Sequence, residues 1–441
     1  MVIRCDDWFL AVKVGSWGRL GDEEHLYVPV ARDSALHIKS AEHKTLAYGM
    51  GRSYGDVCLN VSGSLYFTRA LDRFVHFNPD SGELVCEAGV LLGDIQRIFS
   101  QKGWMLPVTP GSQYVTVGGA VANDVHGKNH HTHGCFSNHV NWLQIERTDG
   151  ELITCSASEN SDWFAATSGG LGLTGVIRRL SINLKPVESS WLDTETLIFS
   201  NIDEFLTLST ESEANWEYTV SWVDCGANKH KRGVFIRANH SQKAFADVPR
   251  KRKIAMPIVP PVSLVNRMSV AAFNPLYFYA HKFKGGWGKS HYEPFFYPLD
   301  GILNWNRMYG PRGFYQYQLV LPKETSVVAI NAILEAISAS GQGSFLSVLK
   351  TFGSKVSPGL LSFPMEGVTL ALDFPNQGGK TLRLFERLDA IVSEAKGRLY
   401  PAKDARMPAS LFANGYPQLD HFIRYRDPGI SSGLSRRLMG W

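Results

Sequence analysis

Two glycine-dense segments limit most strongly what this chain can fold into. The first is YGMGRSYGD (48–56), and the second begins TVGGAVAND (116–124). Glycine at this density lets the backbone take positive φ and approach a ligand closely, and successive amides in such turns form concave sites for anions. The second segment continues into HGKNHH (126–131), whose side chains can transfer protons or place charge. Two converging turns of this kind predict a pyrophosphate-containing cofactor beside titratable side chains.

The composition is that of an ordinary globular chain. Of 441 residues, 44% are hydrophobic and 20% are charged, and this length suffices for two domains. The net charge of +4 is too small to indicate nucleic acid and agrees with a basic patch facing anionic ligands or a membrane surface. The six cysteines form no C-x-x-C pair, so neither a zinc site nor a disulfide framework is predicted. Without a signal-like start or an apolar run of about 18 residues, we expect a cytoplasmic protein.

The order of apolar runs and turn signals predicts an α+β fold. Up to Pro186, short strands lie between turns, and the spacing over 91–99 is helical. After Pro186, alternating runs such as 316–321 and 368–374 predict a second, largely antiparallel sheet. Helices of this second part are expected near 324–340 and 379–396.

Residues 240–290 show the least regular pattern. The basic run PRKRK (249–253) precedes the apolar segment MPIVPPVSLV (256–265), and an aromatic stretch then ends among lysines. Two interpretations remain open. One is a mobile loop with a solvated run of charge. The other is a mobile lid that rests on a membrane, with basic residues near anionic lipid and apolar residues inserted.

Several motifs occur in the order found in a known flavoprotein family. They are the segments 48–56, 110–111, 116–119, 124–131, 170–177, 305–311, 316–318 and 399–406. Together they resemble the vanillyl-alcohol-oxidase type of FAD-binding flavoprotein, and within it a branch that acts on polyprenyl-phosphate-linked pentoses. The resemblance implies an FAD-binding domain formed by residues 1–187 and 398–441. Residues 188–397 would form a substrate-binding domain, with 240–290 as a mobile lid.

The resemblance also implies which residues hold the cofactor. FAD would bind noncovalently, because many members attach the flavin through a histidine where this chain has Arg52, which cannot form that bond. For the first glycine loop, an ordinary tight turn is the alternative. The pyrophosphate cradle and the flavin contacts would come from Gly49, Gly51, Arg52, Ser53, Tyr54, Gly55, Gly111, Thr116, Val117, Gly118, Gly119, Ile177 and Tyr400.

His126 and Lys403 match family residues beside the flavin and the substrate, so the resemblance implies catalytic roles for both. An imidazole near neutral pH can orient a hydroxyl or take its proton, although a structural hydrogen bond within the loop is the alternative. Lys403 would stabilise the anionic reduced flavin or, with a pKa lowered by burial, act as a base; an exposed lysine is the alternative. The aligned substrate-binding residues are Gln316, Gln318 and Lys350, the last as a phosphate anchor.

The chain departs from the family pattern where the substrate is expected. The four departures are Phe296, Ser347, Thr369 and Ala371. All four are expected to line the substrate pocket, whereas the flavin loops are intact, so the cofactor is predicted more firmly than the substrate. His130 and His131 are expected to be structural, and no metal site is predicted because no carboxylate or cysteine pattern accompanies them.

The implied function is FAD-dependent oxidation of a secondary hydroxyl of a sugar. That hydroxyl would be the 2′-hydroxyl of a polyprenyl-phosphoryl-β-D-ribose, oxidised to a keto sugar in an epimerisation pathway of cell-envelope synthesis. A separate NAD(P)H-dependent short-chain reductase would complete the epimerisation, and the protein would be cytoplasmic or peripheral at the inner face of the membrane. The alternatives are a soluble sugar or alditol oxidase without a lipid carrier, and a catalytically silent relative that binds a carbohydrate or lipid phosphate.

Overall fold

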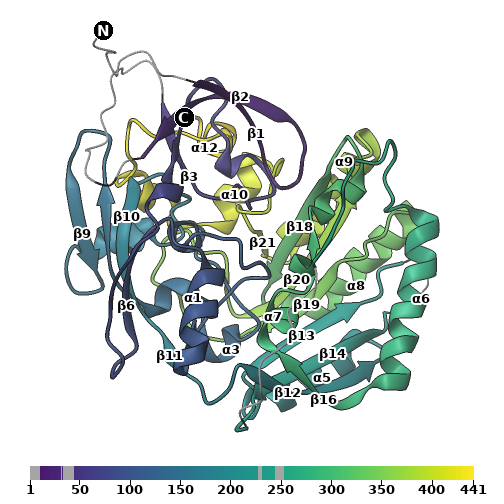
Figure 1. The fold of residues 1–441 in the computed structure, drawn as a ribbon. Coiled ribbons are helices and arrows are strands. Elements are labelled where there is room, and N and C mark those ends of the chain that lie inside the picture. The colour runs from purple at the N-terminus through teal and green to yellow at the C-terminus, as the bar shows by residue number, and fades with distance from the viewer. Residues whose placement is uncertain (1–9, 31, 33–43, 227–230, 244–252) are drawn as a thin grey trace.

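The computed structural model describes residues 10–30, 32, 44–226, 231–243 and 253–441 (Figure 1). Two sheet-containing parts lie side by side in these ranges, the first built from strands before Pro186 and the second from strands after it. The predicted α+β fold with a largely antiparallel second sheet is confirmed. No helix in the described ranges is long and apolar enough to cross a bilayer.

The first part contains a four-stranded and a five-stranded sheet. The four-stranded sheet runs, in spatial order, β1 (Leu10–Gly15), β2 (Asp22–Pro29), β4 (Ser64–Phe67) and β3 (Thr45–Tyr48). The antiparallel five-stranded sheet runs β5 (Phe74–Phe77), β6 (Glu83–Glu87), β10 (Val176–Asn183), β8 (Val140–Glu146) and β9 (Leu152–Ser156). Its helices are α1 (Leu92–Phe99), α2 (Val117–Ala122), α3 (His130–His133) and α4 (Ser161–Thr167). The helix expected over 91–99 is thus present as α1.

The second part is one eight-stranded antiparallel sheet. Its strands in spatial order are β16 (Gly286–His291), β12 (Trp191–Phe199), β14 (Gly233–His240), β13 (Tyr218–Val223), β19 (Ser347–Phe352), β20 (Gly367–Pro375), β18 (Phe314–Leu321) and β21 (Arg398–Leu399). One face carries α5 (Ile202–Glu213), α8 (Lys323–Ser340) and α9 (Gly379–Glu394), which share one apolar core with the strands. The helices expected near 324–340 and 379–396 are therefore confirmed.

The chain returns to the first part after the eighth strand. β21 pairs with β18 at the edge of the eight-stranded sheet. The tail then forms α10 (Ala409–Gly415), α11 (Leu419–Ile423) and α12 (Gly433–Met439), which lie beside the four-stranded sheet (Figure 1). Arg437 of α12 donates hydrogen bonds to both carboxylate oxygens of Asp56, at 2.9 and 3.0 Å, which fixes the tail to the end of the first glycine loop.

Residues 253–291 are more regular than the sequence indicates. They contain β15 (Ile254–Ala255), which pairs with β17 (Ile302–Leu303), then α6 (Arg267–Lys284) and β16. The Asn266 side chain accepts hydrogen bonds from the Met268 and Ser269 amides and so caps α6. The helix was missed because apolar residues occur on all sides of it and Pro275 lies inside it. Residues 249–252 of the basic run lie outside the described residues.

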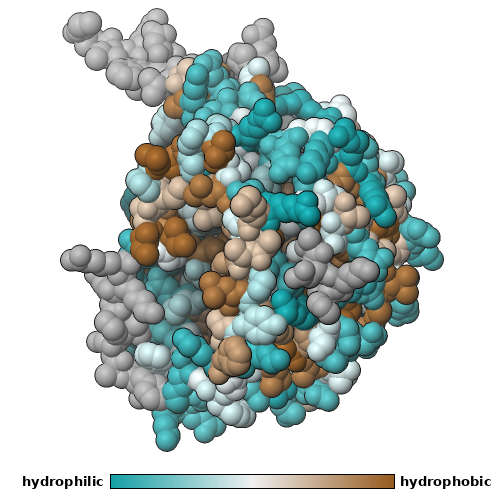
Figure 2. All heavy atoms as spheres, turned by 90° about the vertical axis from the view of Figure 1, so that its right-hand side faces the viewer, coloured by the Kyte–Doolittle hydropathy of each residue, from teal (hydrophilic) through white to brown (hydrophobic). Residues whose placement is uncertain are grey.

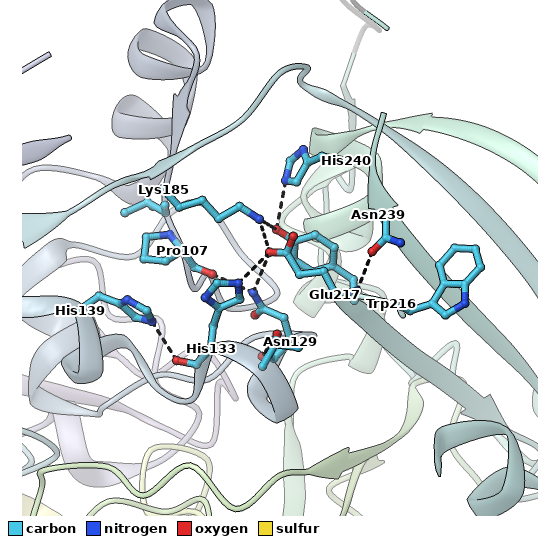
Figure 3. Close-up of polar contacts among 12 residues, drawn as sticks. Pro107, Asn129, His133, His139, Lys185, Trp216, Glu217, Asn239 and His240 are labelled. Atoms are coloured by element: carbon cyan, nitrogen blue, oxygen red, sulfur yellow. Dashed lines mark hydrogen bonds and ion pairs between the residues drawn. The ribbon is translucent and has the colours of Figure 1, made fainter. Parts of the chain in front are cut away.

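A polar cluster joins the two parts around Glu217 (Figure 3). Lys185 of β11 (Lys185–Pro186), a strand paired with β7 (Trp104–Met105), donates a short hydrogen bond to the carboxylate of Glu217. His133 Nε2 lies 3.2 Å from the same oxygen, and the Asn129 side chain donates to it at 3.4 Å. Although burial opposes ionisation, the His133 hydrogen bond and the Lys185 charge hold the pKa of Glu217 well below its usual range. The cluster therefore ties α3 and β11 to the start of β13.

We predict that Glu217→Gln lowers the free energy of unfolding by about 2 kcal/mol at pH 7.5. This is less than the roughly 3–5 kcal/mol for a fully buried pair, because the Glu217 side chain keeps 18% of its exposure. Since the folded pKa is depressed, this stabilisation is complete above the reference value of 4.5 and declines as the pH falls below it. Thermal unfolding at pH 7.5 and pH 4 measures both effects.

The matched control is Glu335→Gln. Glu335 pairs with Lys231 at 2.9 Å, but its side chain is 70% exposed, so water screens the pair and the change in stability should be much smaller than that of Glu217→Gln. Equal losses in the two variants would contradict a structural role for the Glu217 cluster.

Candidate active site

The two glycine loops meet in the structure. The first follows β3, and Gly51 takes a φ of +57°, a conformation that favours glycine. The second runs into α2, where the Thr116 side chain accepts a hydrogen bond from the Gly119 amide at 3.1 Å. A Cβ atom added at Gly49 would lie 2.6 Å from Thr116 Oγ1, and one at Gly118 would lie 2.9 Å from the Cβ of Ala88. The contact between the loops at Gly49, and the contact with Ala88 at Gly118, therefore leave no room for a side chain at either glycine.

The backbone amides of the two loops differ in what they can bind. Within the described residues, the amides from Gly49 to Ser53 donate to no protein acceptor. In the second loop, the Val117 amide donates to Val90 O and the Gly118 amide to Ala88 O, both at 2.8 Å. The first loop thus offers donors to an anion, whereas the second contributes close backbone packing. The sequence had predicted amide donors from both loops.

One cavity is lined by both loops and by the facing sheet. Of the residues predicted to bind cofactor or substrate or to catalyse, those that line it are Gly49, Gly51, Arg52, Ser53, Tyr54, Gly111, Thr116, Gly118, Gly119, His126, Ile177, Gln316, Gln318, Lys350, Tyr400 and Lys403. The structure therefore brings residues from both glycine loops, from β18 and β19, and from the segment after β21 to one site.

Three predicted residues do not line this cavity. Val117 is fully buried in the core of the first part. Gly55 packs against the backbone of Asp404, whose carbonyl oxygen would lie 1.8 Å from an added Cβ. Ser347 is buried on the other face of β19, because side chains alternate along a strand and its neighbours Leu346 and Val348 face the cavity. Phe296, Thr369 and Ala371 do line it.

His126 is the centre of the polar contacts in the cavity. Its Nε2 lies 2.9 Å from the side-chain amide of Gln318, and its Nδ1 lies 3.3 Å from Lys350 Nζ. Lys350 also donates a hydrogen bond to Gly127 O at 3.0 Å. Burial and then the charge of Lys350 lower the pKa of His126 well below its usual range, so the imidazole is neutral at pH 7.

These contacts permit two proton arrangements. A neutral imidazole has one N–H and one lone pair, so His126 cannot accept a hydrogen bond at both nitrogens. If the Gln318 amide nitrogen donates to Nε2, then Nδ1–H must donate to an uncharged Lys350. If Lys350 is charged and donates to Nδ1, then Nε2–H must donate to Gln318, whose amide turns to present its oxygen. The protonation state of Lys350 therefore sets the tautomer of His126.

The cavity concentrates positive charge. Burial lowers the pKa of Lys128 to about 7 and that of Lys350 to about 7, in each case helped by a neighbouring lysine. Burial likewise lowers the pKa of Lys403 to about 8, and this side chain lies 4.1 Å from the ring centre of Tyr54. Shifts of this kind gather at functional sites, and here they favour an anionic ligand that would restore the full charge of the lysines.

Comparison with known proteins agrees with this geometry. An FAD binding domain model matches residues 34–156. Decaprenylphosphoryl-beta-D-ribose oxidase of Mycolicibacterium smegmatis is 35% identical over 415 residues, which covers 89% of this chain and 88% of that protein. An uncharacterised protein of Streptomyces coelicolor is 30% identical over 79% of this chain and all of its own length. L-gulonolactone oxidase of Mus musculus is 27% identical over 42% of each chain.

The chain belongs to the decaprenylphosphoryl-beta-D-ribose oxidase family. It is an FAD-dependent oxidoreductase that acts on CH–OH groups, and the resemblance found in the sequence motifs is confirmed.

The residues present fit FAD. The amides of Gly49 to Ser53 suit the pyrophosphate, and the tight approach of Gly118 to Ala88 lets a ligand lie against bare backbone. Arg52, at the place that carries a histidine in many flavoproteins of this type, lines the same cavity, with its guanidinium 4.1 Å from the centre of the Trp17 ring. The Tyr400 hydroxyl donates to Asn123 O at 2.8 Å, which ties the segment after β21 to α2.

Lys128 lines the cavity and Asp373 lies behind Gln316, and the sequence motifs assigned neither residue to the site. Gln316 donates a hydrogen bond to the fully buried carboxylate of Asp373 at 2.7 Å, and burial raises the pKa of that carboxyl to about 7. Strand alternation was the missed signal, since Asp373 is two residues beyond Ala371 on the same face of β20. Lys128 was visible in the second loop, but its place in the cavity depends on a contact with Phe295 O across the chain.

We predict that Gly49→Ala weakens FAD binding about tenfold. The added methyl group forces the Thr116 side chain away, and loss of such a helix cap costs roughly 0.5–2 kcal/mol, a range that includes the roughly 1.4 kcal/mol of a tenfold change in an equilibrium constant. Gly301→Ala is the control, because no atom lies within 4 Å of its Cβ position and it does not line the cavity. Titration of flavin-free protein with FAD measures the difference. Equal affinities would contradict the tight contact between the loops.

We also predict that Asp373→Asn removes a pH dependence of stability. Because the folded pKa of about 7 is above the reference value of 3.8, the folded protein holds this proton more tightly. The wild type should therefore lose stability relative to the variant as the pH rises from 5 to 8, by at most about 4 kcal/mol. Thermal unfolding of both proteins at the two pH values tests this. Parallel pH curves would show that Asp373 titrates normally.

Proposed function

We propose that this FAD-dependent enzyme oxidises the 2′-hydroxyl of a polyprenyl-phosphoryl-β-D-ribose to a keto sugar. The observation that carries the proposal is the pairing of neutral His126 with Lys350 in a cavity lined by both cofactor loops. The similarity to decaprenylphosphoryl-beta-D-ribose oxidase over 89% of the chain supports the substrate class.

His126 and Lys350 form the proton-accepting pair in this proposal. The substrate hydroxyl takes the place of the Gln318 amide at Nε2, and its proton passes to His126. The Nδ1 proton then passes to uncharged Lys350, whose ammonium group is held by Gly127 O. This route suits an imidazole whose pKa is too low to keep a proton itself. FAD, when bound, supplies the acceptor for the hydride equivalent.

Other residues of the cavity orient the substrate and balance its charge. Gln316 is held in one orientation by Asp373, so its free side-chain oxygen can accept a hydrogen bond from a sugar hydroxyl. Lys128, with its pKa lowered by burial, is suited to the substrate phosphate, whose charge would keep the lysine protonated. Lys403 would stabilise negative charge that develops on the flavin side.

Three further expectations belong to this proposal. Arg52 supports noncovalent FAD, because a guanidinium cannot form the bond that a histidine makes. A keto sugar product requires a reductase to complete an epimerisation, and an NAD(P)H-dependent short-chain enzyme is the proposed partner. A lipid-linked substrate supports peripheral contact with the inner face of a membrane.

A soluble sugar or alditol oxidase is the second candidate. Thr369 and Ala371 support it, because both departures from the family pattern line the cavity. A silent binding relative is disfavoured by the intact contacts among His126, Gln318 and Lys350.

The visible spectrum of the holoenzyme under anaerobic conditions tests the proposal. Addition of a polyprenyl-phosphoryl ribose should bleach the flavin, whereas free ribose should not. Bleaching by free sugars alone would favour the soluble oxidase, and no bleaching by any sugar would favour the silent relative.

We predict that Lys350→Met slows this bleaching about 100-fold, the usual size of a lost proton acceptor. The wild-type rate should rise with pH, because the uncharged lysine is the active form, with a midpoint at or above the pKa of about 7 that Lys350 has before anions bind, and the variant should lose this rise. Lys355→Met is the control, because Lys355 is exposed and does not line the cavity. A Lys350→Met rate equal to the control would exclude Lys350 as the proton acceptor.

A further inference from the structure

The outer face of α6 exposes a continuous apolar stripe. The exposed fraction is 83% for Met268, 71% for Leu276, 83% for Phe283 and 44% for Tyr279. Together with exposed Ala272, their spacing of three or four residues, 268, 272, 276, 279 and 283, puts them on one side of a helix. Figure 2 views this side of the molecule, where hydrophobic residues lie exposed among hydrophilic ones. A soluble helix normally turns such a stripe inward.

The inner face of α6 is fixed to the sheet by specific contacts. Asn274 donates a hydrogen bond to the buried carboxylate of Asp224 at 2.8 Å. Phe278 packs in one cluster with Trp222, and the Arg232 guanidinium lies 4.3 Å from the centre of the Phe278 ring. The helix therefore cannot rotate to bury its outer stripe without breaking a buried polar contact.

The segment that carries the stripe has charged residues of one sign. From Val248 to Tyr292 the sequence contains no aspartate or glutamate. Arg267 is exposed at one end of α6, and Lys282 and Lys284 are exposed at the other. Two copies of this face packed on a two-fold axis would bring like charges together, which disfavours self-association. An apolar stripe flanked by basic residues matches an anionic lipid surface.

The side of α6 opposite the stripe packs against residues that border the candidate active site. Phe273 of α6 stacks edge-on against Phe345, with ring centres 4.9 Å apart. The next residue, Leu346, lines the cavity. Val270 of α6 packs in one apolar cluster with Tyr54 and Trp305, which line the cavity as well. A surface seated on α6 would therefore lie next to the cavity.

We propose that the outer face of α6 binds an anionic membrane, with Met268, Leu276, Tyr279 and Phe283 inserted at the boundary of head groups and acyl chains. Arg267, Lys282 and Lys284 would contact lipid phosphates. This deepens the proposed function, because a lipid-linked substrate would then reach the cavity from the membrane that holds the enzyme. The face is a fixed part of the fold and needs no lid to open.

Co-sedimentation of the FAD-loaded enzyme with vesicles tests the proposal. Vesicles of phosphatidylcholine with phosphatidylglycerol should bind the wild type, and vesicles of phosphatidylcholine alone should bind it more weakly. Combined Met268→Glu, Leu276→Glu and Phe283→Glu should lower the partition coefficient about tenfold or more, because each change removes an apolar side chain from the lipid. Combined Lys282→Glu and Lys284→Glu should lower binding only to the anionic vesicles.

The matched control is a triple variant with the same three added glutamates at exposed apolar positions outside α6. Leu152, Val328 and Val356 are 55%, 77% and 83% exposed and lie outside α6, so their combined change to glutamate should leave binding unaltered. FAD content and melting temperature check the fold of every variant, and Phe283→Glu alone replaces the triple variant if that variant fails to fold. Equal vesicle binding by the α6 and control variants, or no binding by the wild type, would overturn the proposal.

The reaction is measured separately with a short-chain phosphoryl ribose in solution. The α6 variant should oxidise it as fast as the wild type and should lose rate only on vesicle-embedded substrate. Because vesicles without substrate report binding alone, failure of the membrane contact and failure of the oxidation are distinguished.

Gel filtration tests whether the face is instead a contact between copies of the chain. If the triple variant is a monomer where the wild type is a dimer, and its vesicle binding is unchanged, the proposal fails.

Discussion

Three lysines and a histidine line one cavity, and their desolvation governs the chemistry of the site. Burial removes the water that would stabilise each ammonium group, and the pKa values of Lys128, Lys350 and Lys403 fall to between about 7 and 8. Burial, and after it the neighbouring charges, lower the pKa of His126 and keep it neutral. An anionic ligand reverses the effect, because it stabilises the charged lysines. Binding of FAD or of a lipid phosphate is therefore coupled to proton uptake and to the stability of the fold.

The fold supplies this cavity by setting two unlike surfaces against each other. The cofactor side is a bare backbone surface, where glycine at positions 49 and 118 permits close contact. The opposite side is a sheet whose alternating residues present Gln316, Gln318 and Lys350. The cluster around Glu217 joins the two sides and lies close to the active residues, since the amide of Thr219 donates to Lys128 O at 2.8 Å. These polar contacts keep the loop that carries His126 and Lys128 in register with β13.

The sequence predicted the parts of the site that depend on local backbone. Glycine spacing located both loops, and the ordered motifs led to the family. The predictions failed where the position of a residue depends on a distant partner. Asp373 reaches Gln316 only because β20 pairs with β18, and Val117 packs in the core with its amide donating to Val90 O. Ser347 was assigned to the cavity by alignment, although the alternation of β19 turns it to the other face. For the other residues named from the sequence, the structure gives the position in the fold, and the chemical role remains a proposal.

The structure of α6 explains why a helix is hard to predict from the sequence of this segment. A helix in a soluble protein is recognised by one apolar face, but α6 has an inner face anchored partly by polar contacts and an outer face that is apolar. The usual period is therefore blurred, and Pro275 weakens the signal further. Local rules of this kind are broken at functional sites, where another requirement outweighs them. The Asn274–Asp224 contact holds the inner face of α6 to the sheet. A lipid surface against the outer face would then explain why Phe283 is exposed.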